Sequence, residues 1–398
     1  MNIVFIFSSR FPYGEAYSSR ARNLVKLLCE CGHHVHVIAL KGKEDYCSEL
    51  DGYDYSCQYV HDPKDFWTLS GIGTHKPYME ALENYSLRNS VDLVLSSSMV
   101  FVADHIEKFC EEKKIPYIIE QCEWYDASIF KGGKFNPYYR EHVKRIVWKN
   151  KSLDAVIAIS SLLEKHYASQ GMKTIRIPTI LDVKNTQWRN STTEEGPVRI
   201  IFAGSIGKGK ERFDHILTAL KEINSDEVRI VLDIFGADEQ QVRDNLGDQS
   251  QILDELKECM VIHGRIPQRD IEDQFRNADY SIFMRPERNS SNAGFPTKLA
   301  ESMAVGTPVI TNNTGDIRMY LINGFNGFLL EKPSSEKIYE VFESICNRNA
   351  SEDSAMRCNA RKTAEKYFSF RRYIEPLNNL LLEVINNDKD NRQRTRPY

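Results

Sequence analysis

Short runs of β-branched and aromatic residues alternate along the chain with longer stretches in which apolar residues recur every three or four positions. Short runs of this kind are typical of buried strands, and the longer stretches are typical of helices that cover a sheet. In the first half the predicted strands are residues 3–7, 35–39, 93–96, 117–120 and 155–159. In the second half they are residues 199–203, 229–235, 260–263, 280–284, 308–311 and 327–330. The alternation predicts an α/β fold of two doubly wound, Rossmann-like domains in tandem.

Polar segments interrupt this alternation and mark the predicted domain limits. Residues 42–65 are polar, acidic and rich in tyrosine, which predicts a long excursion from the sheet. The pattern is lost again before residue 198, which predicts a linker over 183–197 between a domain of residues 1–182 and a domain of residues 198–369. We expect a helix over about residues 370–387 to pack back on the first domain. The polar, basic residues 388–398 are predicted to be disordered.

Size and charge narrow the class of protein. A chain of 398 residues exceeds the length at which one core usually divides. A net charge of -4 gives no electrostatic reason to expect a nucleic-acid partner. The first residues lack a basic leader, and no apolar stretch is long enough to span a bilayer. We therefore expect a cytoplasmic protein, with the inner face of the plasma membrane as an alternative location.

Cysteine and histidine spacing predicts neither disulfides nor metal. The nine cysteines include one close pair, Cys29 and Cys31, which forms neither a disulfide framework nor a zinc motif. The ten histidines show no ligand spacing either. A reducing compartment and the absence of any metal or other cofactor are expected.

A glycine-rich turn, residues 204–210, follows the first strand of the second domain and leads into an apolar helix. Its glycines would let backbone amides approach an anion, and Lys208 and Lys210 could neutralise a diphosphate. The turn lacks the Ser or Thr of a Walker loop and the glycine spacing of a dinucleotide fingerprint. A flexible turn with solvated lysines is the alternative for this segment on its own.

A second candidate segment, residues 294–310, reads as a stiff turn, a short helix and a buried strand. Lys298 falls in the first helical turn, where the helix dipole makes a cation unfavourable unless an anion is bound. A diphosphate would supply that anion. Pairing of Lys298 with Glu301, three residues on, is the alternative.

Five segments of the second domain, taken in order, resemble the donor domain of the GT-B glycosyltransferases, and specifically glycosyltransferase family 4. They are residues 202–205 with Lys210, 233–236, 263–266, 277–279 and 294–309. The resemblance covers nearly the whole chain and is clearest from Val198 to Leu330. It implies two domains that face each other across a cleft and a nucleotide-sugar donor, which is a substrate and not a cofactor.

The resemblance also implies roles for the matching residues. Glu301 would accept hydrogen bonds from the ribose hydroxyls. The helix start at Thr297, Lys298 and Leu299 would meet the diphosphate, and Lys210, with Lys298, would stabilise the departing phosphate. The other matching donor-binding positions are Gly14, Gly204, Arg265, Ile266, Gly294, Phe295 and Pro296.

Two positions depart from the family pattern. Ala293 stands where the family has a glutamate that contacts the donor sugar, and Ser205 stands where it usually has an arginine. Arg285 or Lys208 is the expected substitute for that arginine. Retention of configuration, which the family mostly shows, is expected here, with inversion left open by Ala293.

The first domain offers candidates for the acceptor side. Beyond its fourth strand, where the family often has a histidine, the chain has Glu123 and Asp126. Glu123, or else Asp126, is the candidate for contact with the donor sugar or the acceptor hydroxyl, and a solvated loop carboxylate is the alternative. Residues 138–151 form a basic, aromatic helix that predicts either peripheral contact with an anionic membrane or an ordinary solvated helix with one packed face.

Together these features predict a glycosyltransferase that moves a sugar from a nucleotide-diphosphate donor, UDP-linked rather than GDP-linked, to a hydroxyl of a glycan or lipid-linked saccharide. Bacterial surface polysaccharide biosynthesis is the role that the resemblance implies. A nucleotide-sugar epimerase of the same fold and a non-catalytic nucleotide- or glycan-binding protein are the alternatives. The sugar, the acceptor, the linkage and the oligomeric state are not specified by the sequence.

Overall fold

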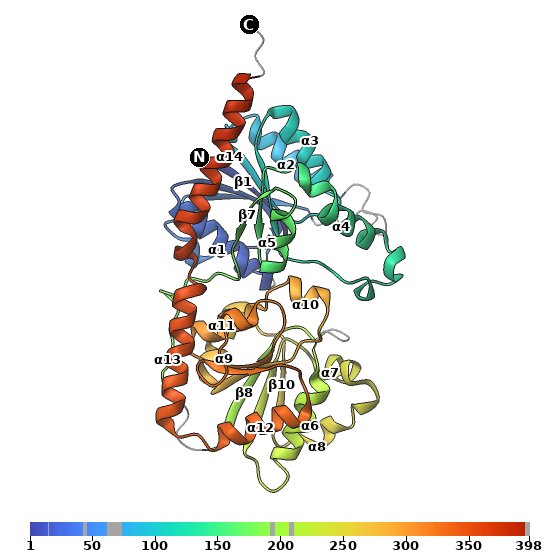
Figure 1. Cartoon of the computed structure of the whole chain (residues 1–398), viewed down its shortest axis with the longest axis vertical. Coiled ribbons are helices and arrows are strands. Elements are labelled where there is room, and N and C mark those ends of the chain that lie inside the picture. Colours follow the sequence, from blue (N-terminus) through green and yellow to red (C-terminus); the bar gives the residue numbers. More distant parts are fainter. Residues whose placement is uncertain (15, 43–45, 62–73, 192–195, 207–210, 395–398) are drawn as a thin grey trace. The chain divides into compact units, whose positions relative to one another are not determined.

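The computed structural model of the chain describes residues 1–14, 16–42, 46–61, 74–191, 196–206 and 211–394, with side chains up to residue 386 except that of residue 16. The chain divides into two compact units (Figure 1). The first unit comprises Met1–Ile180, Asn292–Phe295 and the chain from Phe370 on, and the second unit comprises Leu181–Ser291 and Pro296–Ser369.

Among the described residues, the first unit contains a sheet of seven parallel strands in the order β3-β2-β1-β4-β5-β6-β7. The strands are β1 (Asn2–Phe11), β2 (His34–Lys41), β3 (Tyr55–Val60), β4 (Leu93–Ser97), β5 (Tyr117–Gln121), β6 (Ala155–Ala158) and β7 (Lys173–Arg176). The parallel pairing confirms the predicted α/β class.

The two edge strands of this sheet were not predicted. Strand β3 lies inside residues 42–65, so the prediction that this segment leaves the sheet was wrong for Tyr55–Val60, which pairs with β2. Strand β7, Lys173–Arg176, pairs with β6. Both strands are largely half-buried. An edge strand pairs on one side only, and its sequence need not carry the continuous apolar run of a central parallel strand.

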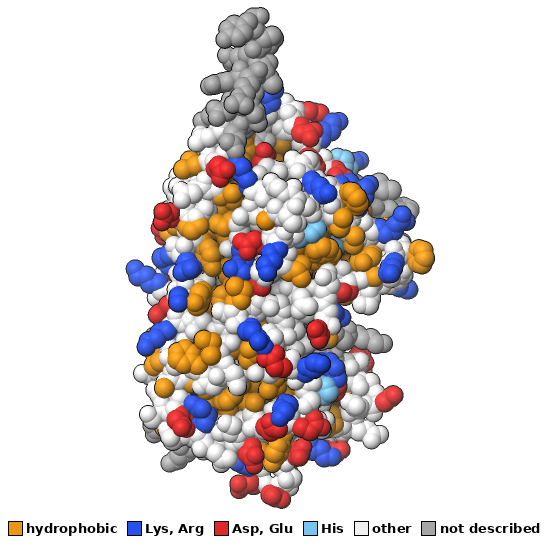
Figure 2. All heavy atoms as spheres, in the orientation of Figure 1, with side chains coloured by type: hydrophobic (Ala, Val, Ile, Leu, Met, Phe, Trp, Pro, Cys, Tyr) orange, Lys and Arg blue, Asp and Glu red, His pale blue; other side chains and the backbone are white. Residues whose placement is uncertain are grey.

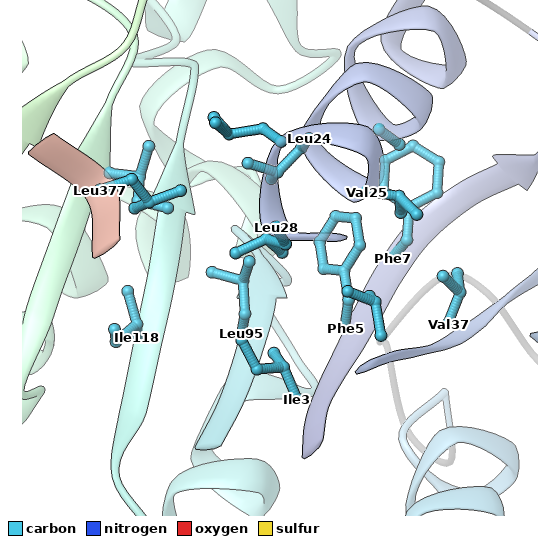
Figure 3. Close-up of a cluster of buried hydrophobic side chains, with 14 of the residues drawn as sticks. Ile3, Phe5, Phe7, Leu24, Val25, Leu28, Val37, Leu95, Ile118 and Leu377 are labelled. Atoms are coloured by element: carbon cyan, nitrogen blue, oxygen red, sulfur yellow. The ribbon is translucent and has the colours of Figure 1, made fainter. Parts of the chain in front are cut away.

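Helices surround the first sheet. They are α1 (Ala16–Glu30), α2 (Lys76–Ser86), α3 (Ala103–Lys113), α4 (Pro137–Val147), α5 (Ser161–Ala168) and α14 (Ile374–Arg394). Phe5 and Phe7 of β1 face Leu24 and Leu28 of α1 in the buried core (Figure 3). Leu377 of α14 belongs to the same core.

Helix α14 is longer than expected. The sequence predicted disorder from Asp388, whereas the helix continues through Arg394. Residues 388–394 contain neither glycine nor proline, so nothing in their sequence ends a helix that is already formed.

The second unit contains, within the described residues, a sheet of six parallel strands in the order β10-β9-β8-β11-β12-β13, all of them predicted. The strands are β8 (Val198–Ala203), β9 (Ile230–Phe235), β10 (Met260–Gly264), β11 (Tyr280–Phe283), β12 (Val309–Asn312) and β13 (Gly327–Leu330). The helices are α6 (Phe213–Ile223), α7 (Glu239–Leu246), α8 (Ile252–Glu255), α9 (Ile271–Asn277), α10 (Asn289–Ala293), α11 (Thr297–Ala304), α12 (Ser335–Cys346) and α13 (Ala350–Tyr367). The strand order reverses between β8 and β11, and in sheets of this kind ligands bind at such a switch point.

The first half of the predicted linker is a packed part of the second unit. Arg361 of α13 donates hydrogen bonds to the carbonyl oxygens of Val183 (2.6 Å) and Thr186 (3.1 Å). Arg357, one turn earlier, donates to that of Arg189 (3.1 Å). The linker prediction over 183–197 is therefore corrected for residues 183–189. Their polar composition is typical of a loop, and the arginines that hold them lie about 170 positions further along the chain.

Candidate functional site

Four predicted site residues follow strands of the second sheet. Gly204 and Ser205 come directly after β8, Arg265 comes after β10, and Arg285 comes shortly after β11. Since the strands of this sheet are parallel, the carboxyl ends of β8, β10 and β11 lie at one edge of the sheet, with β9 between β10 and β8. The fold therefore gathers residues that are up to 81 positions apart in the sequence, from 204 to 285.

Glycines let the loops at this edge touch through their backbones. Gly204 donates its N–H to the carbonyl of Phe235 (3.0 Å), and Gly236 donates to that of Gly264 (2.7 Å). Gly236 has φ +94°, and a Cβ on it would lie 2.6 Å from the oxygen of Gly204. No side chain fits between the two loops, so glycine at position 236 lets their backbones pack in direct contact.

Helix α11 (Thr297–Ala304) begins in the same unit. Its N-cap residue is Pro296, whose side chain makes no capping hydrogen bond to the first turn. Leu299 and Met303, which are completely buried, anchor the helix. The N–H groups of an uncapped first turn carry partial positive charge, and they are suited to bind an anion.

Lys298 connects the start of α11 with the glycine turn after β8. Its Nζ donates a hydrogen bond to Oε1 of Glu211 (2.8 Å) and lies 3.2 Å from the position that a Cβ on Gly204 would take. The same nitrogen lies 4.1 Å from the centre of the Phe202 ring and 5.0 Å from that of Phe283. The ion pair thus reaches Glu211, 87 positions away, which the sequence analysis did not select.

Arg285 is held by Asn312 at the end of β12. Asn312 accepts a hydrogen bond from the backbone N–H of Arg285 (2.7 Å) and donates one to its carbonyl (2.8 Å). The guanidinium of Arg285 donates to the carbonyl of Ser291 (3.0 Å). Asn312, which is buried, was also missed by the sequence analysis, because nothing in its neighbourhood distinguishes it from a turn residue.

The other predicted donor-binding residues are distributed as follows. Arg265 is exposed, Ile266 is half-buried against a small apolar cluster, and Thr297 and Glu301 are half-buried on α11. Lys208 and Lys210 lie outside the described residues.

The turn before α11 belongs to the first unit by its packing. Ala293, Gly294 and Phe295 are all buried there. Ser160 of the same unit donates a hydrogen bond to the carbonyl oxygen of Ala293 (2.6 Å). The position that carries an acid in family 4 is thus filled by a completely buried alanine.

Gly14 lies in the first unit, just before α1. A Cβ at this position would lie 2.7 Å from Cβ of Arg10 and 3.0 Å from Oγ of Ser18. Ser18 in turn donates a hydrogen bond to the carbonyl of Arg10 (2.7 Å). The close packing explains why this turn needs glycine.

Glu123 is exposed beyond β5, and Asp126 is half-buried. The Gln121 side chain donates to the backbone carbonyl of Glu123 (2.6 Å), which fixes the chain there. Burial, followed by the charge of Glu123, raises the pKa of Tyr125. Because neither carboxylate is fully buried, Glu123 and Asp126 both remain candidates for contact with a substrate.

A buried histidine lies beside this loop. Nε2 of His142 accepts a hydrogen bond from the backbone N–H of Tyr125 (3.1 Å). Burial lowers the pKa of His142 to about 4, so the ring is neutral near pH 7. The sequence analysis missed it, because His142 lies in a helix whose basic residues dominate the pattern.

The described residues offer neither a cluster suited to a metal ion nor a helix suited to span a membrane. In the part of the chain that the structure describes, no three His, Cys, Asp or Glu side chains are grouped so that they could hold a metal ion. The described helices also include none that combines the length and apolar character needed to cross a membrane.

Comparison with solved structures defines the class of fold. The sucrose-phosphate synthase (tll1590) of Thermosynechococcus elongatus matches with a TM-score of 0.74 at 14% identity, over 97% of this chain and 100% of that one. HepE of Anabaena, solved with UDP and glucose, matches with a TM-score of 0.71 at 14% identity, over 96% and 100%. The chain has the GT-B glycosyltransferase fold, as predicted.

The part of the chain that carries the candidate site is similar to a known family. Residues 184–363 match the family described as Glycosyl transferases group 1. Nearly all of the matched residues lie in the second unit. Membership of family 4 in particular stays a prediction.

A curated relative is found in Klebsiella pneumoniae. It is described as an uncharacterized 41.2 kDa protein in the cps region, and it is 24% identical over 213 residues. The match covers 51% of this chain and 54% of that protein, so this chain matches about half the length of its relative.

Proposed function

We propose that the protein transfers a sugar from a UDP-linked donor to a hydroxyl of a glycan or lipid-linked saccharide, with retention of configuration, during assembly of a bacterial surface polysaccharide. The observation that carries the proposal is the proximity of Gly204, at the end of β8, to Lys298 in the first turn of α11, inside the part of the chain that matches the group 1 glycosyltransferase family. UDP in the HepE structure supports the choice of nucleotide. The cps region of the Klebsiella relative supports the polysaccharide role.

The chemistry requires stabilisation of a leaving diphosphate. As the bond from the anomeric carbon to the phosphate oxygen breaks, negative charge develops on that oxygen. We propose that the backbone amides at the start of α11 bind the diphosphate beside the glycine turn at Gly204, with Lys210 and Arg285 as the cations. These groups would act without a bound metal ion.

The remaining predicted residues complete the proposed site. Glu301 is proposed to bind the ribose, and Arg265 with Ile266 the base. Glu123, or Asp126, is proposed to contact the donor sugar or the acceptor hydroxyl. The other proposed donor-binding positions are Gly14, Ser205, Lys208, Gly294, Phe295, Pro296, Thr297 and Leu299.

A panel of UDP-, GDP- and ADP-sugars tests the proposal. Nucleotide release that rises with added acceptor, with retained anomeric configuration in the product by NMR, is the expected result. Formation of an isomeric nucleotide sugar without acceptor would instead indicate an epimerase. Tight binding without turnover would indicate a non-catalytic binding protein.

A basic, apolar surface on the first unit bears on where the enzyme works. We define the basic tip as residues 127–152, all of which the structure describes. Its most exposed apolar side chains are Ile129, Phe135 and Trp148, which are 47%, 88% and 67% exposed. Its exposed cations are Lys131, Lys134, Arg140, Lys144 and Lys151. Apolar and basic side chains gather over this part of the first unit (Figure 2).

The charge of the basic tip favours an anionic lipid surface as its partner. Its one acidic residue, Glu141, is half-buried and paired with Lys149. Exposed cations are attracted to anionic headgroups, and exposed aromatic rings enter the interface. We propose peripheral contact with the cytoplasmic face of the membrane on this basis.

Vesicle flotation tests the membrane contact. The protein should float with vesicles that contain anionic lipid and not with neutral ones, and high salt should weaken the binding. Phe135→Ala combined with Trp148→Ala should abolish flotation. Phe325→Ala, at a ring on the second unit that is 48% exposed, is the matched control and should have no effect. Equal flotation with neutral and anionic vesicles would contradict the proposed contact.

A further inference from the structure

The ion pair between Lys298 and Glu211 differs from the surface ion pairs of the second unit. The two side chains are 14% and 3% exposed. In the surface pair Lys337–Glu340, both side chains are 59% exposed. The Lys298 ammonium is also close to the rings of Phe202 and Phe283. Burial removes most of the water that would otherwise screen its charge.

One ammonium group connects three segments of the chain. Lys298 lies in the first turn of α11, and Glu211 lies two residues before the start of α6. The Nζ atom also lies 3.2 Å from the position of a Cβ on Gly204, directly after β8. The ends of three elements are thereby held at one point of the sheet edge.

The pair also resolves the electrostatic conflict at the start of α11. A cation in the first turn opposes the helix dipole, and a nearby negative charge is needed to offset it. Glu211 supplies that charge from within the protein. Its other oxygen, Oε2, is buried and has no hydrogen-bond partner among the described residues. Lys298 is therefore paired with a buried carboxylate of the protein itself. No external anion is required to offset its charge at the start of α11.

We infer that Glu211 is a positioning residue of the donor site, and that Lys298 supports the structure of this site and does not bind the diphosphate. The pair holds the start of α11 against Gly204, so that the backbone amides of the first turn of α11 are in place beside the glycine turn before the nucleotide binds. This inference depends on the proposed function. It replaces the catalytic role that the sequence predicted for Lys298.

A double-mutant cycle on UDP affinity tests the inference. Lys298→Met and Glu211→Leu should each weaken UDP binding, measured by calorimetry, by about tenfold or more, because each leaves a buried charge without its partner. The double variant replaces the pair with apolar side chains of similar size, and methionine packs well against aromatic rings. It should recover UDP affinity to within about threefold of the wild type.

Controls separate positioning from general loss of structure. The matched double variant Lys337→Met with Glu340→Leu removes an exposed pair of the same unit and should change nothing. All affinities are measured at a temperature where circular dichroism shows each variant to be folded. Under these conditions a purely structural role would leave UDP affinity unchanged in every variant. Glu211→Gln, which keeps a hydrogen-bond acceptor, should lose less affinity than Glu211→Leu.

The outcomes are distinct. If the double variant binds UDP as weakly as Lys298→Met alone, the lysine itself contacts the ligand and the inference is wrong. If both single variants bind like the wild type, the pair does not position the site and the inference is also wrong. Failure of the wild-type protein to bind UDP, GDP or ADP would contradict the proposed function itself.

Discussion

Buried histidines make the stability of the first unit dependent on pH. His142 accepts a hydrogen bond at Nε2 from the N–H of Tyr125, so a proton on that nitrogen would break the bond. Burial lowers the pKa of both His142 and His36 to about 4. The unfolded chain, in which histidine has its usual pKa near 6.5, therefore binds more protons than the folded chain between about pH 4 and 6.5.

The free energy of unfolding should accordingly fall as the pH is lowered from about 6.5 to 4, by roughly 1.4 kcal/mol per pH unit for each of these histidines. His142→Gln keeps an acceptor for the N–H of Tyr125 and does not titrate, so it should reduce this slope. Urea unfolding at several pH values measures the effect. An unchanged slope in the variant would show that His142 does not contribute.

Gly236→Ala tests the backbone contact at the second sheet edge. The added Cβ would lie 2.6 Å from the oxygen of Gly204, at a residue with φ +94°. We expect a loss of about 1–3 kcal/mol of stability and about tenfold weaker UDP binding, because Gly204 must move. Gly247→Ala is the matched control, since its φ is +59° and its Cβ would have no atom within 4 Å. Its alanine carries backbone strain without a clash, so it should lower stability by about 1–2 kcal/mol and leave UDP binding intact. Equal loss of UDP affinity in both variants would contradict the role of Gly236.

At the scale of elements, helix α13 organises the second unit through two arginines. Arg357 is completely buried, and its guanidinium donates hydrogen bonds to the carbonyls of Ala278 (2.9 Å), Asp279 (3.1 Å) and Arg189 (3.1 Å). Carbonyl oxygens that are buried together need such a donor, because leaving them unpaired is costly. Helix α13 thus connects the residues just before β11 with residues 183–189, near the start of the second unit.

Arg357→Met should lower the free energy of unfolding by about 3–5 kcal/mol, because several buried carbonyls lose their donor at once. Arg318→Met removes an exposed ion pair with Glu331 and is the matched control, with an expected loss below about 1 kcal/mol. Urea denaturation of both variants measures the difference. Similar losses in the two variants would show that the hydrogen bonds of Arg357 contribute little.

Elements that are regular and buried were predictable from the sequence, whereas partners distant in the sequence were not. Central strands such as β1 and β4 carry apolar runs. The glycine-rich turn was expected after the first strand of the second domain, and Gly204 directly follows β8. The edge strands β3 and β7 lack such runs. Glu211, Asn312 and His142 act through partners brought near by the fold, and no local pattern distinguishes them from solvated polar residues.

At the scale of the whole molecule, ligand binding should be visible as thermal stabilisation. UDP at about 100 times its dissociation constant should add about 2.7 kcal/mol of stability by mass action, and GDP and ADP should add less. A thermal-shift assay measures this. Because the proposed site uses amides and cations, EDTA should leave both the UDP shift and the transfer activity unchanged, and loss of either on chelation would contradict the metal-free proposal.

The path of the chain through its two units constrains how the protein is made. The polypeptide starts in the first unit, builds the second, and returns with α14 to the first. Leu377, Leu381 and Val384 therefore leave the ribosome after the second unit, although they share a core with Phe5 and Leu24. The first unit keeps an apolar surface uncovered until α14 has been synthesised. A truncated product that stops at Ile180 would keep that surface bare and should aggregate. Because Asn292–Phe295 also belongs to the first unit, exchange of the second unit between relatives requires four junctions.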